Sequence, residues 1–141
     1  MKKREAEFTT RFKKWLHAQP SSDSAAAYEI KVTTGKSIPF SDVQPHQVDA
    51  LVQVRENFFS FKIPDAGYQN PFDMFIMNKQ RAYVVMAFLT PRQPAKVWVI
   101  DIRVFLTMRE ERNVLGIKSA NEDSLYQYNK EYGDDCRCYV F

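Results

Sequence analysis

Apolar and polar positions recur with two different periods in the first part of the chain, and each period predicts a different element. From Glu5 to His17 the apolar residues recur at intervals typical of an amphipathic helix, and they are Phe8, Phe12, Trp15 and Leu16. From Ala25 to Thr33 the period changes to two, with Tyr28, Ile30 and Val32 on one side. This alternation predicts a half-buried strand.

A second helix is predicted after that strand. Ser41 is followed three residues later by Gln44, a spacing that has the form of a capping box, and Pro45 is tolerated in a first helical turn. We therefore expect a helix from Asp42 to Glu56. Its inward face would consist of Val48, Leu51 and Val52.

Four later runs are rich in aromatic and β-branched residues, as strands are, and they span 57–63, 71–77, 82–89 and 96–102. Several are apolar on both faces, so we expect them in the interior of a sheet covered by helices. A helix is expected at 103–112. From residue 113 onward the pattern indicates only a weakly helical stretch at 122–132.

These elements predict an α/β (α+β) fold with a mixed central sheet of about five strands flanked by helices. The 141 residues, 45% of them hydrophobic, suit a single domain spanning 1–141. Residues 113–141 would form a C-terminal extension whose structure the pattern leaves open.

Basic residues gather at the start of the chain. The net charge is only +3, but residues 1–14 carry six basic side chains against two acidic ones, a local charge of +4. Such a surface attracts phosphates, although a solvated helix face has the same composition. The candidate DNA-binding residues are these six and two later lysines: Lys2, Lys3, Arg4, Arg11, Lys13, Lys14, Lys36 and Lys62.

Several classes of protein are disfavoured by the sequence. The two cysteines, Cys136 and Cys138, and the two histidines suit neither a disulfide framework nor a zinc site. No apolar run is long enough to span a membrane, and the N-terminus resembles no signal peptide. We expect a cytoplasmic protein without a membrane partner, and a virus-encoded protein acting in the host cytoplasm also fits.

Glu29 and Lys31 form the candidate chemistry. Residues two apart in a strand point the same way, so the carboxylate and the ammonium project together. Metal-assisted phosphodiester hydrolysis uses such a pair, because the carboxylate holds Mg²⁺ and the lysine orients the attacking hydroxide. An exposed strand face with a salt bridge has the same pattern, and a metal site needs at least one more carboxylate.

The stretch YEIKVTTGKSIPFSDVQPHQVDALVQV, residues 28–54, supplies a context for this pair. It resembles the core of the PD-(D/E)XK nuclease superfamily, in particular RecU-type Holliday junction resolvases and related phage nucleases. The resemblance covers residues 25–102 and includes the runs AYVVMAF and KVWVIDI. The matching positions are Glu29, Lys31, Thr33 or Thr34, the SIPF segment, and His46 with Gln47.

The resemblance implies a restriction-endonuclease-like fold and a role for each matching residue. Glu29 would be a metal ligand, Lys31 the catalytic lysine, and Gln47 would point its amide at the site. The family often adds a glutamate from the first helix. Glu5 shares the inward side of that helix whereas Glu7 does not, so Glu5 is the candidate. The implied cofactor is Mg²⁺ or Mn²⁺.

The second metal carboxylate departs from the family pattern. The family places an aspartate on a strand upstream of the acidic-x-Lys strand, but here only Asp23, in a serine-rich loop, is upstream. Asp73 interrupts an apolar strand, where a charge is costly unless it is paired or metal-bound. We therefore expect Asp73 and Glu29 to bind the metal, with Asp23 as the alternative.

The resemblance implies a Mg²⁺-dependent endonuclease that acts on DNA, most specifically on branched DNA such as a Holliday junction. Symmetric cuts in two strands call for two related sites, so a homodimer is expected. Two alternatives stay open. One is a nuclease of the same fold that acts on other DNA in restriction, repair or phage DNA processing, and the other is a DNA-binding module without catalysis.

Overall fold

The computed structural model describes residues 2–19, 25–61 and 75–141. Its helices and strands, in chain order, are α1 (Lys2–His17), β1 (Ala26–Thr33), β2 (Ser37–Pro39), η1 (Phe40–Asp42), α2 (Pro45–Glu56), β3 (Phe58–Phe61), β4 (Phe75–Asn78), β5 (Arg81–Phe88), β6 (Lys96–Asp101), α3 (Ile102–Val114), β7 (Ser119–Asn121), α4 (Glu122–Tyr132), η2 (Gly133–Asp135) and β8 (Cys136–Val140). This arrangement confirms the predicted α+β class with a mixed sheet flanked by helices.

A four-stranded sheet forms the centre of the described fold, in the order β1-β5-β6-β8. β1 is parallel to β5, whereas β5 and β6 are antiparallel, as are β6 and β8. The parallel pair requires a crossover, and α2 forms part of it. β1 and β8 are therefore the two edges of the sheet.

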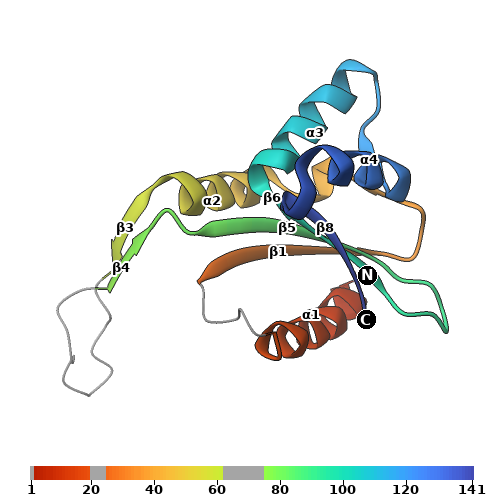
Figure 1. Cartoon of the computed structure of the whole chain (residues 1–141), viewed down its shortest axis with the longest axis horizontal. Coiled ribbons are helices and arrows are strands. Elements are labelled where there is room, and N and C mark those ends of the chain that lie inside the picture. The colour runs from red at the N-terminus through yellow and green to blue at the C-terminus, as the bar shows by residue number, and fades with distance from the viewer. Residues whose placement is uncertain (1, 20–24, 62–74) are drawn as a thin grey trace.

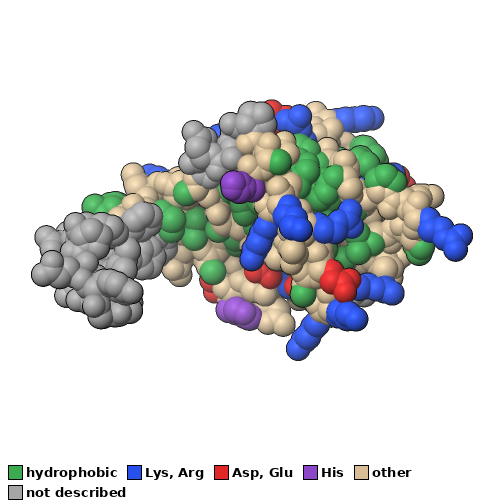
Figure 2. Space-filling model, turned by 90° about the horizontal axis from the view of Figure 1, so that it is seen from below, with side chains coloured by type: hydrophobic (Ala, Val, Ile, Leu, Met, Phe, Trp, Pro, Cys, Tyr) green, Lys and Arg blue, Asp and Glu red, His purple; other side chains and the backbone are tan. Residues whose placement is uncertain are grey.

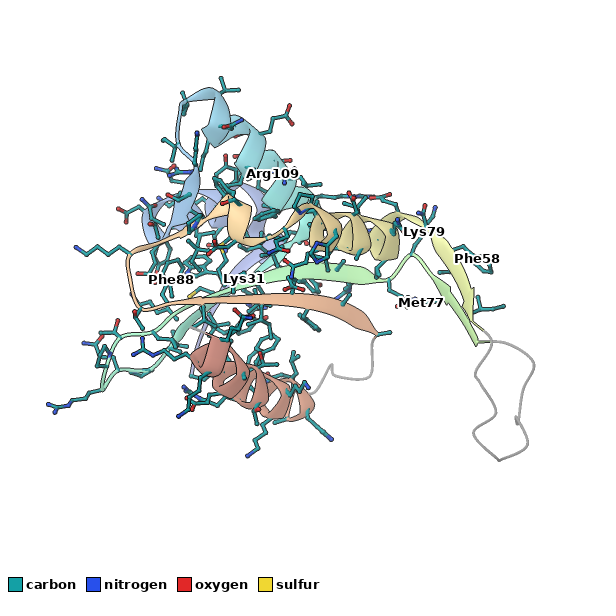
Figure 3. All side chains as sticks on the ribbon, turned by 180° about the vertical axis from the view of Figure 1, so that it is seen from behind. Lys31, Phe58, Met77, Lys79, Phe88 and Arg109 are labelled. Carbon is teal, nitrogen blue, oxygen red and sulfur yellow. The ribbon has the colours of Figure 1, made fainter. Side chains whose placement is uncertain are left out.

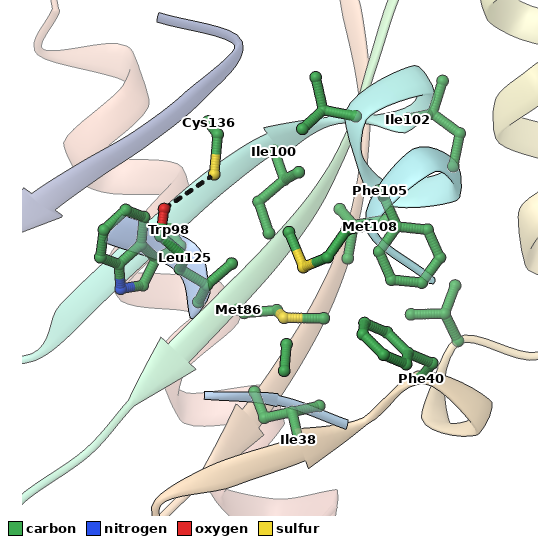
Figure 4. Packing of buried hydrophobic residues seen from close by; sticks show 14 of the residues in the cluster. Ile38, Phe40, Met86, Trp98, Ile100, Ile102, Phe105, Met108, Leu125 and Cys136 are labelled. Carbon is green, nitrogen blue, oxygen red and sulfur yellow. Dashed lines mark hydrogen bonds between the residues drawn. The ribbon is translucent and has the colours of Figure 1, made fainter. Parts of the chain in front are cut away.

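Helices cover both faces of this sheet (Figure 1). α1 lies on one face, where Phe8 and Phe12 pack against Val85 and Val97. The other three helices lie on the opposite face. The core on their side includes Met86, Trp98, Ile100, Phe105 and Met108, all of which are fully buried. Figure 4 shows how these side chains pack against one another.

The predicted interior position of the last two strand runs is confirmed. In β5 and β6 the residues Val84, Val85, Val97 and Trp98 are all 0% exposed, because helices cover both sides of these strands. The expected inward face of α2 is also observed. Val48 and Leu51 are buried, and Val52 is half-buried.

The predicted start of α2 was wrong by three residues. Residues 40–42 form a short 3₁₀ turn, and α2 begins at Pro45 with Gln44 as its N-cap. A proline disfavours helical geometry in the residue before it, and Gln44 is extended with ψ of 157°. The capping box is therefore formed by Gln44 and Gln47, and not by Ser41 and Gln44 as predicted.

The predicted strands at 57–63 and 71–77 were wrongly placed inside the central sheet. β3 and β4 pair with each other as a separate antiparallel ribbon, which extends away from the end of α2 (Figure 1). Phe58 is 58% exposed and Ile76 is 51% exposed on this ribbon. β5 already has β1 and β6 as its two neighbours, so apolar composition alone did not determine which sheet these strands would join.

The C-terminal residues complete the central sheet. α4 covers residues 122–132, the stretch for which the sequence indicated weak helicity, and Asn121 caps it by accepting a hydrogen bond of 2.8 Å from Ser124 N. Gly133 ends this helix with φ of +61°, a conformation that suits glycine. β8 then pairs along β6. Residues 113–141 therefore form part of the same packed unit.

Candidate functional site

β1 separates its side chains between the two faces of the sheet. Tyr28, Ile30 and Val32 pack on the face that α1 covers, so Glu29 and Lys31 point to the other face, where α2 lies. Lys31 Nζ lies 3.2 Å from Glu29 Oε1, and the side chains of Lys31 and Glu29 are 14% and 27% exposed. The sequence prediction that these two groups project together is therefore confirmed by geometry.

The pair has the chemistry of a phosphate site or of a structural ion pair. A half-buried carboxylate is a hard oxygen ligand suited to Mg²⁺, and a neighbouring ammonium stabilises an anion. Each residue is the other's ion-pair partner, which lowers the cost of holding both charges in a partly buried position. The geometry is compatible with both functions.

The predicted second carboxylate lies outside the described residues. This is true of Asp73, of its alternative Asp23, and of Lys62. Within the described parts of the chain, no group of three or more His, Cys, Asp or Glu residues could hold a metal ion. Phe58 and Met77 mark the β3–β4 ribbon, which Figure 3 shows well away from Lys31.

Gln47 lies in the first turn of α2, and its amide has a defined partner. The side-chain Oε1 accepts a hydrogen bond of 2.9 Å from Gln44 N, which completes the capping box. The amide oxygen of Gln47 therefore contributes to the start of the helix. No hydrogen bond to Glu29 or Lys31 is formed by Gln47 within the described residues.

Glu5 is separated from the pair by the sheet. It is half-buried on α1 while Glu7 is exposed, as the helical stripe predicts. However, α1 packs on the face of β1 that carries Tyr28 and Ile30, the face opposite Glu29. The structure therefore does not bring Glu5 together with Glu29 and Lys31.

The basic residues of the first helix are exposed, and they belong to the α1 side of the molecule. Figure 2 views this face, where Lys and Arg side chains are numerous and acidic side chains lie between them. The exposed set is Lys2, Lys3, Arg4, Arg11, Lys13 and Lys14. Arg11 also donates a 3.1 Å hydrogen bond to the carbonyl oxygen of Phe141.

Lys36 occupies a different place from the α1 residues. It is exposed in the turn after β1, and it borders a small hollow of about 360 Å³ together with Phe88 at the end of β5. This hollow lies where the parallel strands β1 and β5 end. Lys36 is therefore a predicted phosphate-binding residue at the same end of β1 as Lys31.

The structure also assembles residues that the sequence did not single out. Tyr28, Arg81 and Tyr83 meet Arg137 and Tyr139 around a cleft of about 950 Å³ on the α1 side of the sheet. The alternation of Arg81 and Tyr83 within one strand shows that they share a face. Their meeting with Tyr28 and Arg137 depends on strand pairing over more than fifty residues, for which the sequence holds no local signal.

Comparison with protein-family models, with curated proteins and with solved structures finds no match for the chain. Candidate functions therefore depend on the residues and their geometry. Among the helices of the described ranges, none is long and apolar enough to cross a lipid bilayer.

Proposed function

We propose that the chain is a metal-dependent endonuclease that hydrolyses phosphodiester bonds in DNA, with a Holliday junction as its preferred substrate. The observation that carries this proposal is the Glu29–Lys31 pair. The two charged groups lie 3.2 Å apart and half-buried on one face of β1. The stretch that resembles a nuclease core provides the same two residues.

Glu29 is the metal ligand in this proposal, with Asp73 as the second carboxylate. Mg²⁺ uses one or two carboxylates, several waters and the substrate phosphate, so this donor set fits it, and Mn²⁺ accepts the same oxygens. When bound, the metal supplies a polarised phosphoryl oxygen and a water of lowered pKa. Lys31 orients the attacking hydroxide and stabilises negative charge on the phosphoryl oxygens in the transition state.

The exposed basic residues would hold the DNA backbone. Lys36 lies at the strand end nearest Lys31, and the basic residues of α1 extend the positive surface over the other face. A homodimer would supply the two related sites that paired cuts in a junction require. A nuclease of the same kind that acts on linear DNA needs no such symmetry.

A DNA-binding module without catalysis is the second candidate. It is favoured by the ion pair itself, because Lys31 and Glu29 already neutralise each other. In this alternative the pair stabilises β1 and the basic surface binds phosphates.

The test is cleavage of labelled four-way junction, duplex and single-stranded DNA with Mg²⁺, Mn²⁺ or EDTA. We expect metal-dependent paired nicks in the junction, and a loss of about 10²-fold or more in Glu29→Gln, Lys31→Met and Asp73→Asn. Arg103 and Glu56 form an ion pair at 2.6 Å that lies outside the hollow beside Lys36, so Arg103→Met and Glu56→Gln are control variants that should retain activity.

Each other outcome selects a different function. Metal-dependent cleavage of linear DNA alone would indicate a nuclease with another DNA substrate. DNA binding without cleavage under any metal would overturn the nuclease proposal and favour the binding module. Sedimentation of the protein with and without junction DNA would test the homodimer.

A further inference from the structure

The 950 Å³ cleft lies on the α1 side of the sheet, opposite the Glu29–Lys31 pair. It is bounded by the last turn of α1, the first residues of β1 and β5, the end of β6, and the start of β8 with the turn before it. Its volume lies within the range of about 300–1,000 Å³ that is typical of small-molecule sites. No residue of the proposed nuclease site lines it within the described chain.

Aromatic rings form the floor of this cleft. Tyr28 pairs in register with Tyr83, and their rings are stacked with centroids 5.5 Å apart and an angle of 23°. Further along β5, Val85 and Ala87 are covered by α1 and are 0% exposed, whereas both tyrosines stay half-buried. The cleft therefore begins where the helix stops covering the sheet.

Arginines and aspartates surround the rings. Arg55 lies 3.4 Å from Asp101, and Arg137 lies 3.6 Å from Asp134, so two of the three arginines in the cleft already have carboxylate partners. None of the ion pairs within the described residues includes Arg81, which precedes Tyr83 by two residues on the same face.

The cleft is thus close to neutral, with Asp135 and His17 also on its walls. Among the described residues, Arg81 is the guanidinium of the cleft that has no carboxylate partner, and one such group suits one phosphate. The three aspartates would repel a long run of phosphates. Asp135 takes part in none of the ion pairs of the described residues, so its carboxylate is available to accept from an amino group of a base.

The tyrosines stay neutral over the physiological pH range. Burial raises the pKa of Tyr28, with smaller contributions from Tyr83 and Tyr139. Burial also raises the pKa of Tyr83, although neighbouring Arg81 opposes this. Neutral phenol rings present π-faces for stacking without repelling a phosphate.

We propose that this cleft binds one nucleotide, with its base stacked on Tyr28 and Tyr83 and its phosphate held by Arg81. Base–aromatic stacking and a bidentate arginine–phosphate contact are the two interactions that the cleft offers side by side. A free nucleotide and one unit of a single strand share this chemistry. The proposal does not depend on nuclease activity, since Glu29 and Lys31 lie on the other face.

The test is a titration with deoxyadenosine, dAMP and an octamer of dA, monitored by tryptophan fluorescence. Trp15 lines the cleft while Trp98 is 0% exposed, so a change in fluorescence reports on the cleft. We expect dAMP to bind to the wild type, and we expect Tyr83→Leu to lower the affinity for dAMP about tenfold. Arg81→Gln should lower the affinity for dAMP by a similar factor and leave the affinity for deoxyadenosine unchanged, because only the nucleotide carries the phosphate.

Matched variants keep the test decisive if Tyr83→Leu fails to fold. Tyr83→Phe preserves the ring and should keep the affinity within about threefold. Tyr126 is a tyrosine with 45% exposure outside the cleft, so Tyr126→Leu should bind as the wild type does. Glu29→Gln should also bind normally, which separates this proposal from the nuclease proposal.

The octamer identifies the source of the nucleotide. Binding of dAMP itself would support a free nucleotide as ligand. Binding of the octamer alone, lost in Arg81→Gln, would support the cleft as a subsite for single-stranded nucleic acid. No binding of either ligand at millimolar concentration would overturn the proposal. Wild-type affinity for dAMP in both Arg81→Gln and Tyr83→Leu would also overturn it, as would equal affinity for dAMP in Tyr83→Phe and Tyr83→Leu.

Discussion

Cys136 is a residue whose chemistry is determined by its surroundings. Its side chain is fully buried among the residues of the core, and Sγ lies 3.7 Å from the carbonyl oxygen of Leu125 (Figure 4). Burial raises the pKa of this thiol from 9.0 to about 12, with a smaller contribution from Cys138. The neutral thiol acts as a small apolar side chain in the core.

This pKa predicts a loss of stability at alkaline pH. Between pH 9 and 12 the unfolded thiol is ionised while the folded thiol keeps its proton, so the unfolded state becomes favoured. Cys136 should therefore lower the free energy of unfolding by about 1.4 kcal/mol per pH unit in that window. Urea denaturation at pH 7, 9 and 10 measures this change in the free energy of unfolding.

Cys136→Ala is the matching variant for that experiment. It lowers stability at every pH because it removes packing, but it should show a shallower decline above pH 9 than the wild type. Burial also raises the pKa values of Cys138 and Tyr128. Both residues are present in the two proteins, so the difference between the two alkaline slopes reports on Cys136. Identical alkaline slopes in the two proteins would contradict the prediction.

Gln47 permits a test that separates a structural role from a catalytic one. Gln47→Ala removes the acceptor for Gln44 N and should lower the free energy of unfolding by about 1 kcal/mol. Gln47→Glu keeps an acceptor oxygen in a capping box, so its stability should equal that of the wild type. Thermal denaturation of both variants measures this.

The same pair of variants tests the role that the nuclease resemblance implies. If the amide N–H of Gln47 contacts the substrate, Gln47→Glu should lose cleavage while it keeps its stability. Unchanged cleavage in Gln47→Glu would limit this residue to helix capping. Unchanged stability in Gln47→Ala would contradict the capping role.

At the scale of the elements, Asp101 connects the end of β6 to the start of α3. Its Oδ1 accepts a 2.9 Å hydrogen bond from Arg103 N, and its Oδ2 lies 3.4 Å from Arg55 Nε on α2. The residue is only 6% exposed. A strand and two helices therefore meet at this carboxylate.

Asp101→Ala should therefore destabilise the protein by about 1–3 kcal/mol, because it removes a helix cap and leaves Arg55 without its partner. Asp101→Asn keeps the helix cap, so it should lower the free energy of unfolding by less than Asp101→Ala does. Urea denaturation with a fixed m-value measures both changes. An equal loss in the two variants would show that the cap makes no separate contribution.

Local patterns predicted most elements because each depends on residues close in sequence. The stripe of α1, the alternation of β1 and the β-branched runs of β5 and β6 all report burial on a regular period. The start of α2 was missed because Ser41 and Pro45 indicate different boundaries. The extended geometry that Pro45 imposes on Gln44 prevailed over the box that Ser41 suggested.

At the scale of the whole molecule, Phe141 connects the C-terminal end to the first helix. Its ring stacks on Trp15 with centroids 4.9 Å apart and an angle of 5°, and it also stacks on Phe8 at 6.1 Å. Its backbone exchanges hydrogen bonds with Ala95 just before β6. The two ends of the described chain therefore stabilise each other.

Phe141→Ala should lower the free energy of unfolding by about 2–4 kcal/mol, because it removes these ring contacts and leaves a space beside α1. Val140 is 63% exposed, so Val140→Ala is a control that should change stability by about 0.5 kcal/mol or less. Guanidinium denaturation measures both. Equal stability of the two variants would contradict the predicted role of Phe141.

The candidate site was predicted only in part. The two-residue period placed Glu29 and Lys31 together, because neighbouring positions in one strand obey a fixed geometry. Glu5 was assigned to the same site, but α1 packs on the opposite face of the sheet. No local sequence pattern predicts which face a helix covers. Asp73 stays a prediction, since it lies outside the described residues.

The sequence by itself determined the periods of burial, and with them the order of most helices and strands and the pairing of Glu29 with Lys31. Only the tertiary structure decided that β3 and β4 leave the central sheet, that β8 completes it, and that Tyr28 meets Tyr83 beside Arg81. The reason is physical. Local periodicity follows from backbone geometry over a few residues, whereas strand register and the face a helix covers depend on packing between segments far apart in the chain.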